Sequence, residues 1–143
     1  MSHIQRSALV PFSAQQMFDL VNDVESYPQR FEWCEAAAVL DRGPGFVVAR
    51  LDVRVGGLKL SFSTRNSLQQ PERIGMSLVE GPFRALSGEW QFRALGETGS
   101  KVSLTLDFEV AGRVVGTALA LGFQGLADRM VDDFVREARQ TYV

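Results

Sequence analysis

Residues 101–110 read KVSLTLDFEV, and residues 126–138, farther along the chain, read LADRMVDDFVREA. Apolar and polar side chains alternate through the first stretch, which predicts a β-strand with one covered face and one wet face. Apolar residues recur every three or four positions in the second stretch, which predicts an amphipathic helix. A sheet with one apolar face must bury that face against another element, so we expect this helix to pack over it.

The two-residue period extends through the middle of the chain. It predicts strands at about 33–42, 45–55, 58–68, 73–80, 85–95 and 100–110, and residues 2–10 predict one more. Ser13 followed by Gln16 is a capping-box pattern, and Tyr27-Pro28 indicates a second short helix or turn. The sequence therefore predicts an α+β fold in which a curved antiparallel sheet of about seven strands grips a long C-terminal helix. Two short helices follow the first strand, and residues 1–143 form one domain.

The predicted C-terminal helix covers about residues 115–142 and has two unlike halves. Glycines at 112, 116, 122 and 125 weaken its beginning, because each costs about 1 kcal/mol relative to Ala inside a helix. We expect residues 111–125 to be loose or bent and to act as a gate, whereas residues 126–141 hold firmly to the sheet.

Composition narrows the function classes. Fifteen basic residues oppose seventeen acidic ones, giving a net charge of −2, so no general field attracts DNA or RNA. Cys34 is the only cysteine, which excludes an intramolecular disulfide and suits a reducing compartment. The N-terminus lacks a signal-peptide pattern and no apolar run reaches about 20 residues. We expect a cytoplasmic bacterial protein, with transient contact to the inner membrane left open.

The polar residues give little sign of catalysis or metal binding. His3 is the only histidine and is expected to face solvent, and Cys34 is expected to be a packed core residue. The neighbouring acids Asp132 and Asp133 are expected to be solvated on the polar side of the helix. No phosphate loop is present. The sequence therefore predicts no catalytic residue, no cofactor and no metal site.

Large apolar side chains provide the stronger functional signal. We expect some of them to line a cavity between sheet and helix, where aromatic rings and flexible methionines adapt to an apolar ligand. The candidates are Phe31, Trp33, Phe62, Met76, Phe83, Trp90, Phe108, Phe123, Met130 and Phe134. Simple core packing is the alternative for each, and for Phe83, in a predicted loop, the alternatives are a cavity lid, a partner contact or packing.

Basic residues predicted on the exposed sheet face are candidates for an RNA-binding surface. Arg50, Arg54, Lys59, Arg65, Arg93 and Lys101 fall on this face, together with the acids Asp52, Glu89, Asp107 and Glu109. Because the charges are mixed and exposed aromatic side chains are lacking, we expect an ordinary solvated surface.

Three segments carry a resemblance to a known family. They are Tyr27-Pro28 followed by Phe31, Trp33 and Cys34; Gly81-Pro82-Phe83 leading into Leu86, Gly88, Trp90 and Phe92; and residues 129–134, RMVDDF. With this order of elements, the chain resembles the START-like, helix-grip superfamily of polyketide cyclase and lipid-transport proteins. Within it, the chain resembles the coenzyme-Q-binding and ribosome-association toxin (RatA) branch. Arg30 and Glu32 depart from the usual pattern, so a more charged entrance is expected there.

The resemblance implies three functions for one scaffold. The first is non-enzymatic binding of a ubiquinone-like isoprenoid quinone or another lipid in the cavity, in support of respiratory quinone function. The second is that of a RatA-like toxin, which binds the large ribosomal subunit and blocks subunit association. The third is polyketide cyclase or dehydratase activity, which would need an acid/base pair inside the cavity. Fold alone does not choose among them.

Overall fold

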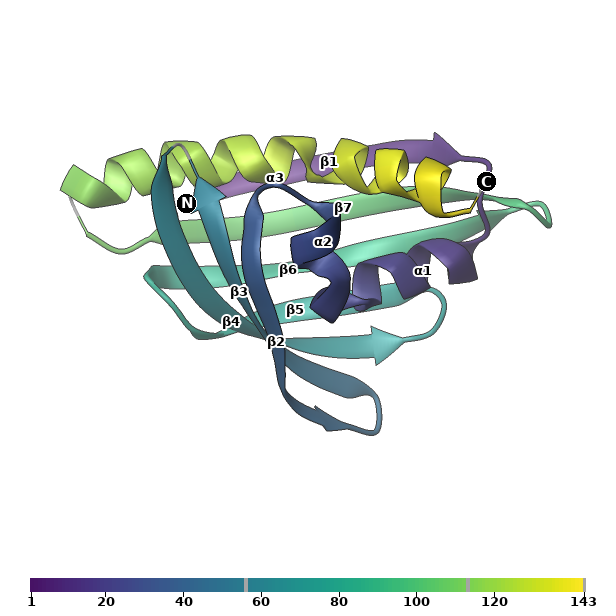
Figure 1. Ribbon diagram of the computed structural model, residues 1–143, viewed down its shortest axis with the longest axis horizontal. Helices are drawn as coiled ribbons and strands as arrows, with labels where there is room; N and C mark the ends of the chain where they lie inside the picture. The colour runs from purple at the N-terminus through teal and green to yellow at the C-terminus, as the bar shows by residue number, and fades with distance from the viewer. Residues whose placement is uncertain (56, 113, 143) are drawn as a thin grey trace.

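The computed structural model describes residues 1–55, 57–112 and 114–142, and contains one antiparallel sheet covered by a long helix (Figure 1). The strands are β1 (Ser2–Val10), β2 (Cys34–Gly43), β3 (Phe46–Val55), β4 (Leu58–Gln69), β5 (Arg73–Glu80), β6 (Phe83–Leu95) and β7 (Gly99–Val110). The helices are α1 (Ala14–Asn22), the 3-10 turn η1 (Val24–Ser26), α2 (Tyr27–Arg30) and α3 (Val114–Thr141). This arrangement confirms the predicted helix-grip fold.

The sheet has the order β1-β7-β6-β5-β4-β3-β2, so the first strand pairs with the last. Residues Ser2 to Val10 pair with Phe108 to Ser100 without a register shift. Helix α3 follows β7 directly and packs chiefly against β1 and β7, while its inner side also reaches β3 and β4 (Figure 1). The chain therefore closes its own core between the inner face of the sheet and α3.

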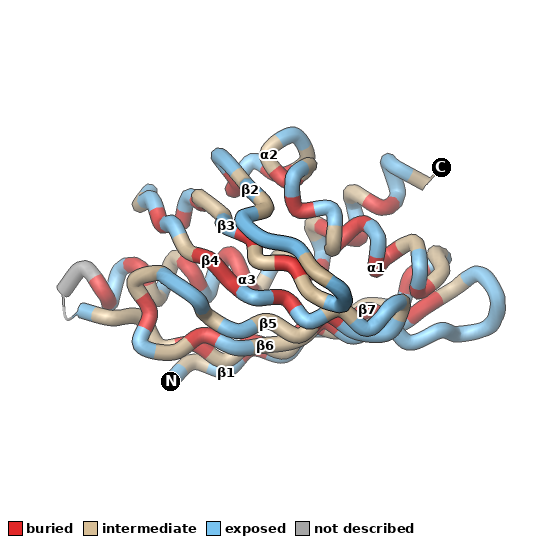
Figure 2. Tube along the Cα trace, turned by 90° about the horizontal axis from the view of Figure 1, so that it is seen from below, coloured by how far each residue is buried: buried red, intermediate tan, exposed pale blue. Residues whose placement is uncertain are grey.

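Alternation along the strands decides which face is inside. In β3, Val47, Ala49, Val53 and Val55 are buried, whereas Arg50 between them is exposed. The same alternation appears as the banded burial along the strands in Figure 2. Each apolar side chain buried in this way contributes about 1.5–3 kcal/mol, which makes the inner face the main source of stability.

Helix α1 closes one end of the sheet, and its start is fixed as the sequence predicted. The Ser13 hydroxyl accepts a hydrogen bond from the Gln16 backbone N–H at 3.1 Å, and Gln16 Oε1 accepts one from the Ser13 N–H at 2.9 Å. This capping box starts the helix at Ala14, which places Met17 and Phe18 on its fully buried side. The Phe18 ring meets Phe92 of β6 edge-on, 5.8 Å between centroids.

The glycine-rich beginning of α3 is part of one continuous helix, and the expectation that residues 111–125 are loose or bent stays a prediction. Gly112 supplies a turn with φ +96° before the helix, and Gly116 lies where a Cβ would come 2.9 Å from the Ala111 carbonyl oxygen. Packing against β1 and β7 therefore offsets the weak helix propensity. The predicted gate stays a prediction.

Two details complete the fold. The turn predicted at Gly56-Gly57 joins β3 to β4, and Gly56 lies outside the described residues. Among the helices that the structure describes, none combines the length and apolar character needed to cross a bilayer.

Replacing Gly125 by Ala tests how firmly the glycine-rich half of α3 is helical. A Cβ at Gly125 meets no atom within 4 Å, so Gly125→Ala should raise the free energy of unfolding by about 1 kcal/mol in urea denaturation. Gly88→Ala is the contrasting control, because its Cβ would overlap the backbone oxygen of Thr105 and destabilise the protein. No gain from Gly125→Ala would mean that this half of α3 is frayed in solution.

Candidate functional site

An internal cavity of about 80 Å³ lies between the inner face of the sheet, the segment from α1 to α2, and α3. Five of the predicted residues are on its wall: Phe62, Met76, Trp90, Phe123 and Met130. The remaining lining residues are Val21, Asn22, Val24, Tyr27, Ala49, Leu51, Thr64, Asn66, Ile74, Leu86, Leu104 and Leu106. The cavity is therefore mostly apolar, and its contact with a ligand stays a prediction.

The other predicted residues are packed in two aromatic clusters outside this wall. Phe83 and Phe108 pack against Phe123, with ring centroids 5.1 and 4.8 Å away. Phe83 is buried at the start of β6, so among its three alternatives the structure favours packing over a lid or a partner contact.

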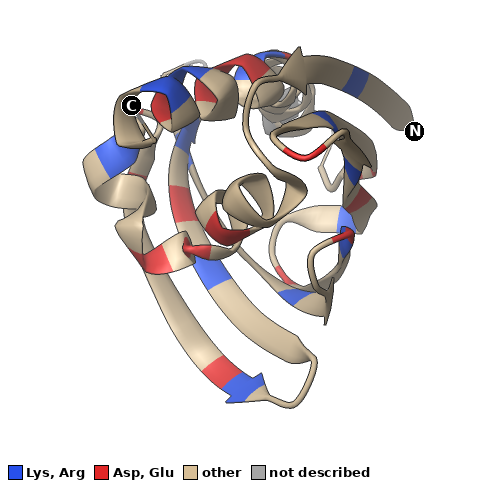
Figure 3. Ribbon diagram, turned by 90° about the vertical axis from the view of Figure 1, so that its right-hand side faces the viewer, with Lys and Arg blue, Asp and Glu red and all other residues tan. Residues whose placement is uncertain are grey.

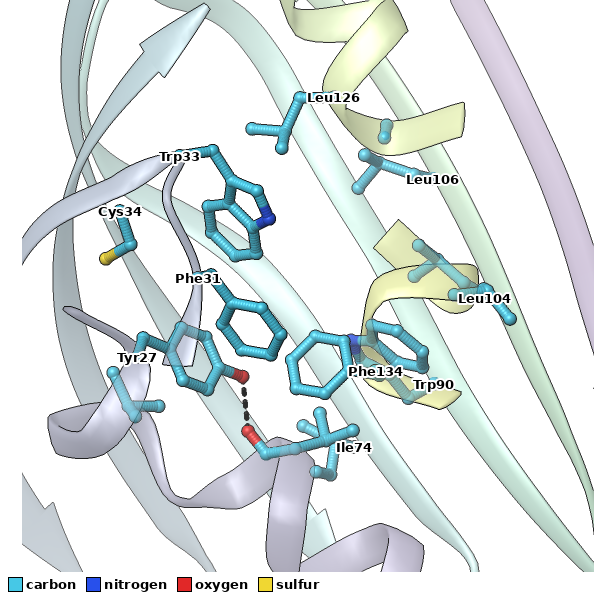
Figure 4. Packing of buried hydrophobic residues seen from close by; sticks show 14 of the residues in the cluster. Tyr27, Phe31, Trp33, Cys34, Ile74, Trp90, Leu104, Leu106, Leu126 and Phe134 are labelled. Atoms are coloured by element: carbon cyan, nitrogen blue, oxygen red, sulfur yellow. Dashed lines mark hydrogen bonds between the residues drawn. The ribbon is translucent and has the colours of Figure 1, made fainter. Parts of the chain in front are cut away.

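The second cluster surrounds Phe134 of α3 and is shown in Figure 4. Phe31 and Trp33 stack on each other at 4.9 Å, and Phe134 meets Phe31 at 4.7 Å and Trp90 at 5.2 Å. Tyr27 completes the cluster, 5.4 Å from Phe134. These rings fill the core between α2 and α3, where they exclude water.

The cavity wall also carries a polar pair that the sequence argument missed. The Thr64 hydroxyl donates to Asn66 Oδ1 at 2.8 Å, and both side chains are buried on β4. A third polar group, Asn22 Oδ1, is buried without a hydrogen-bond partner in the described part of the chain. The inward period of Leu60 and Phe62 continues through positions 64 and 66, and that signal could have revealed the pair.

Two ionisable groups near the cavity are held neutral. The Tyr27 hydroxyl donates to the Val21 carbonyl, and burial raises the pKa of Tyr27 well above its ordinary value. Cys34 is buried, as predicted, and desolvation raises the pKa of its thiol to about 11. Neither group supplies a charge near neutral pH.

A polar clasp joins the α2 segment to α3 on the other side of the aromatic cluster. Arg30 Nη1 donates to Glu137 Oε1 at 3.0 Å and to Thr141 Oγ1 at 2.9 Å. The Trp33 indole N–H donates to Asp133 Oδ2 at 3.0 Å. We call these residues (Arg30, Trp33, Asp133, Glu137 and Thr141) the α2–α3 clasp.

The contacts of the clasp contradict the expectation that Asp133 is solvated. The side chain of Asp133 is only 14% exposed and is bound by Trp33, so it is not a solvated surface acid. Asp132, its neighbour, is exposed as expected. A half-buried carboxylate is stabilised by such a charge-assisted hydrogen bond, which explains an acid on this side of α3.

A charged hollow of about 710 Å³ lies outside the clasp. Figure 3 shows basic and acidic residues interspersed along α3 near the C-terminus. The charged entrance to the cavity expected near Arg30 stays a prediction. The wall of the hollow contains four arginines and four acids. They are Arg30, Arg54, Arg129 and Arg136, with Glu32, Asp132, Asp133 and Glu137. The hollow shares no lining residue with the internal cavity, so the clasp and its aromatic neighbours separate the two spaces.

Residues 10–135 match the family model described as polyketide cyclase/dehydrase and lipid transport. The chain belongs to this family. The crystal structure of the Zhui aromatase/cyclase from a Streptomyces species superimposes with a TM-score of 0.88 over 99% of this chain and 96% of that one. At 22% sequence identity, this likeness shows the shared fold alone.

Curated relatives within the family are more similar in sequence. The ribosome association toxin RatA of Pseudomonas aeruginosa is 46% identical over 141 residues, covering 99% of this chain and 98% of the relative. RatA of Vibrio cholerae is 43% identical, with 99% of both chains covered. The persistence and stress-resistance toxin PasT of Escherichia coli is 42% identical, with 99% and 90% covered.

The three segments that carried the family resemblance meet in this structure. Trp33 from the first segment binds Asp133 from the third, although 100 residues separate them in the chain. Trp90 from the second segment packs on Phe134 from the third. In this member of the polyketide cyclase and lipid-transport family, the segments therefore fasten α3 over the sheet.

Asp133→Ala tests the clasp against a matched substitution one residue away. It removes the acceptor of the Trp33 indole, so the free energy of unfolding should fall by about 1–3 kcal/mol in urea denaturation. Asp132→Ala makes the same change at an exposed site of the same helix and should stay within about 0.5 kcal/mol of the wild type. Equal stabilities for the two variants would contradict a stabilising clasp.

Proposed function

We propose that this chain is a RatA-like toxin, which binds the large ribosomal subunit and blocks subunit association. The observation that carries the proposal is the similarity to RatA proteins over essentially the whole chain, 46% for the P. aeruginosa relative. Identity at this level extends over both the sheet and α3. The proposal thus rests on sequence similarity together with the shape of the site.

The volume of the internal cavity favours the RatA-like function over quinone binding. Ligand pockets for drug-sized molecules usually measure about 300–1,000 Å³. The cavity here measures about 80 Å³, which is well below that range and small for an isoprenoid tail. Quinone binding, the first hypothesis from the sequence, is therefore placed second.

The chemistry of the cavity wall gives less support to cyclase or dehydratase activity. Two buried polar side chains do converge there, Thr64 and Asn66, but neither a hydroxyl nor a side-chain amide titrates near neutral pH as a general acid or base must. Among the described lining residues, the one ionisable group is Tyr27, whose hydroxyl is already bound. A non-catalytic role is consistent with this wall.

Subunit association in a purified system tests the proposal. Adding the folded chain to separated ribosomal subunits at a magnesium concentration that allows association should lower the assembled fraction in a sucrose gradient, in proportion to the amount added. Phe134→Asp, which places a charge at a fully buried position, is the unfolded control and should have no effect. An unchanged ratio of free subunits to assembled ribosomes at excess chain would reject the proposal.

A second candidate function is binding of a small apolar molecule with one polar group, such as the head of a quinone. The observation that favours it is the apolar cavity with the Thr64–Asn66 pair on its wall, because Asn66 retains an amide N–H group for a ligand oxygen.

Thermal unfolding with ubiquinone analogues tests this second function. A short-chain analogue should raise the melting temperature, because a ligand that binds only the folded state stabilises it by mass action. Ala49→Leu fills the cavity from β3 and should abolish the shift. Absence of any shift with the wild-type chain, and of lipid in organic extracts of the purified protein, would count against a ligand.

A further inference from the structure

Two cations face each other on the outer side of the sheet. Arg93 of β6 and Lys101 of β7 are direct partners in the antiparallel register, and both are exposed. Phe92 and Val102, the adjacent residues, are buried, so Arg93 and Lys101 point away from the core. Like charges directly opposite in a sheet are destabilising, which makes this pair a feature that needs an explanation.

Several other cations on the outer face have partners: two form ion pairs, and Arg65 lies over the Phe46 ring, 3.9 Å from its centroid. Arg50 pairs with Asp52 at 3.1 Å, and Arg73 pairs with Glu89 at 2.7 Å. The mixed charges expected from the sequence therefore cancel locally over β3 and β5.

Charges at the β3–β4 end of the sheet cancel in the same way. Arg54 is hydrogen-bonded to Glu35, which lowers the pKa of that carboxyl, and Lys59 lies 3.8 Å from the same group. By contrast, Arg93 and Lys101 form no ion pair in the part of the chain that the structure describes, nor do the nearby acids Glu72 and Glu97.

The surroundings of this pair are exposed and contain uncharged polar groups beside the acids already named, and Gln91 donates a hydrogen bond to Glu89. Leu9 of β1 lies opposite Lys101 and is 72% exposed. The next outward row toward the middle of the sheet contains Ser7, Ser103 and Gln91, which are partners across the three strands. We call Leu9, Arg93, Lys101, Ser7, Ser103 and Gln91 the Arg93–Lys101 patch.

We propose that the Arg93–Lys101 patch contacts the phosphate backbone of ribosomal RNA, an inference that rests on the proposed ribosome association. Arg, Lys, Ser and Gln are among the side chains that bind phosphate and sugar oxygens in nucleic acids. A phosphate between the two cations would also remove their mutual repulsion. An acidic protein surface fits less well, because the two exposed leucines at this end of the sheet, Leu9 and Leu95, are isolated and do not form the apolar core of a protein interface.

Arg93→Glu separates this role from a structural one. It replaces a repulsive cross-strand pair by an attractive one, so the melting temperature should rise by about 1–3 °C. Binding to purified large subunits, measured by pelleting at about 0.1 M salt, should nevertheless weaken at least about 10-fold, with a shallower dependence on salt. Arg84→Glu is the matched control: it makes the same charge change on β6, about 30 Å along the strand, and should bind as the wild type does.

The same variants are tested on protein-free RNA extracted from large subunits. Weaker retention of this RNA by Arg93→Glu but not by Arg84→Glu supports the patch. Wild-type binding to subunits together with unchanged binding by Arg93→Glu overturns the patch and leaves the proposed function standing. Loss of subunit binding with unchanged RNA binding identifies a protein partner and overturns the RNA contact. If the wild-type chain binds neither subunits nor RNA, both proposals fall.

Discussion

The contact that fastens α3 across the inner face of the sheet is the constraint on which the other features depend. Seven strands present one apolar face, and α3 is the element that covers it between β1 and β3. Burial of Phe134 among Phe31 and Trp90 supplies the apolar part of this contact. The hydrogen bond from Trp33 to Asp133 adds direction, because the indole N–H must point at the carboxylate oxygen.

The close packing of α3 against the sheet also limits the space that remains inside the protein. The rings that could have lined a larger space are used to pack α2 against α3, so about 80 Å³ remains inside. The hollow outside the clasp is larger, about 710 Å³, but its wall is charged. The interior is therefore largely filled by the chain's own side chains, which is consistent with the proposed function at the surface.

The local charge of the outer sheet face depends on which residues the strand pairing places opposite each other. Arg50 has Asp52 two residues away on its own strand, whereas strand register sets Arg93 against Lys101, so two parts of the outer face differ in local charge. The net charge of the whole chain does not reveal this local difference in charge. An antiparallel sheet with a solvated face can thus hold a small basic patch within a chain of net charge −2.

The sequence by itself determined the elements and their inner faces, because periods of two and of about 3.6 residues are local properties of the backbone. It also placed the capping box at Ser13, the buried thiol of Cys34 and the ten large apolar side chains on inward-facing segments. Only the tertiary structure decided which rings line the cavity, why Asp133 is half-buried, and which cations meet. Those outcomes depend on strand register and on contacts between residues as far apart as Trp33 and Asp133, and such distances are set by packing the whole core.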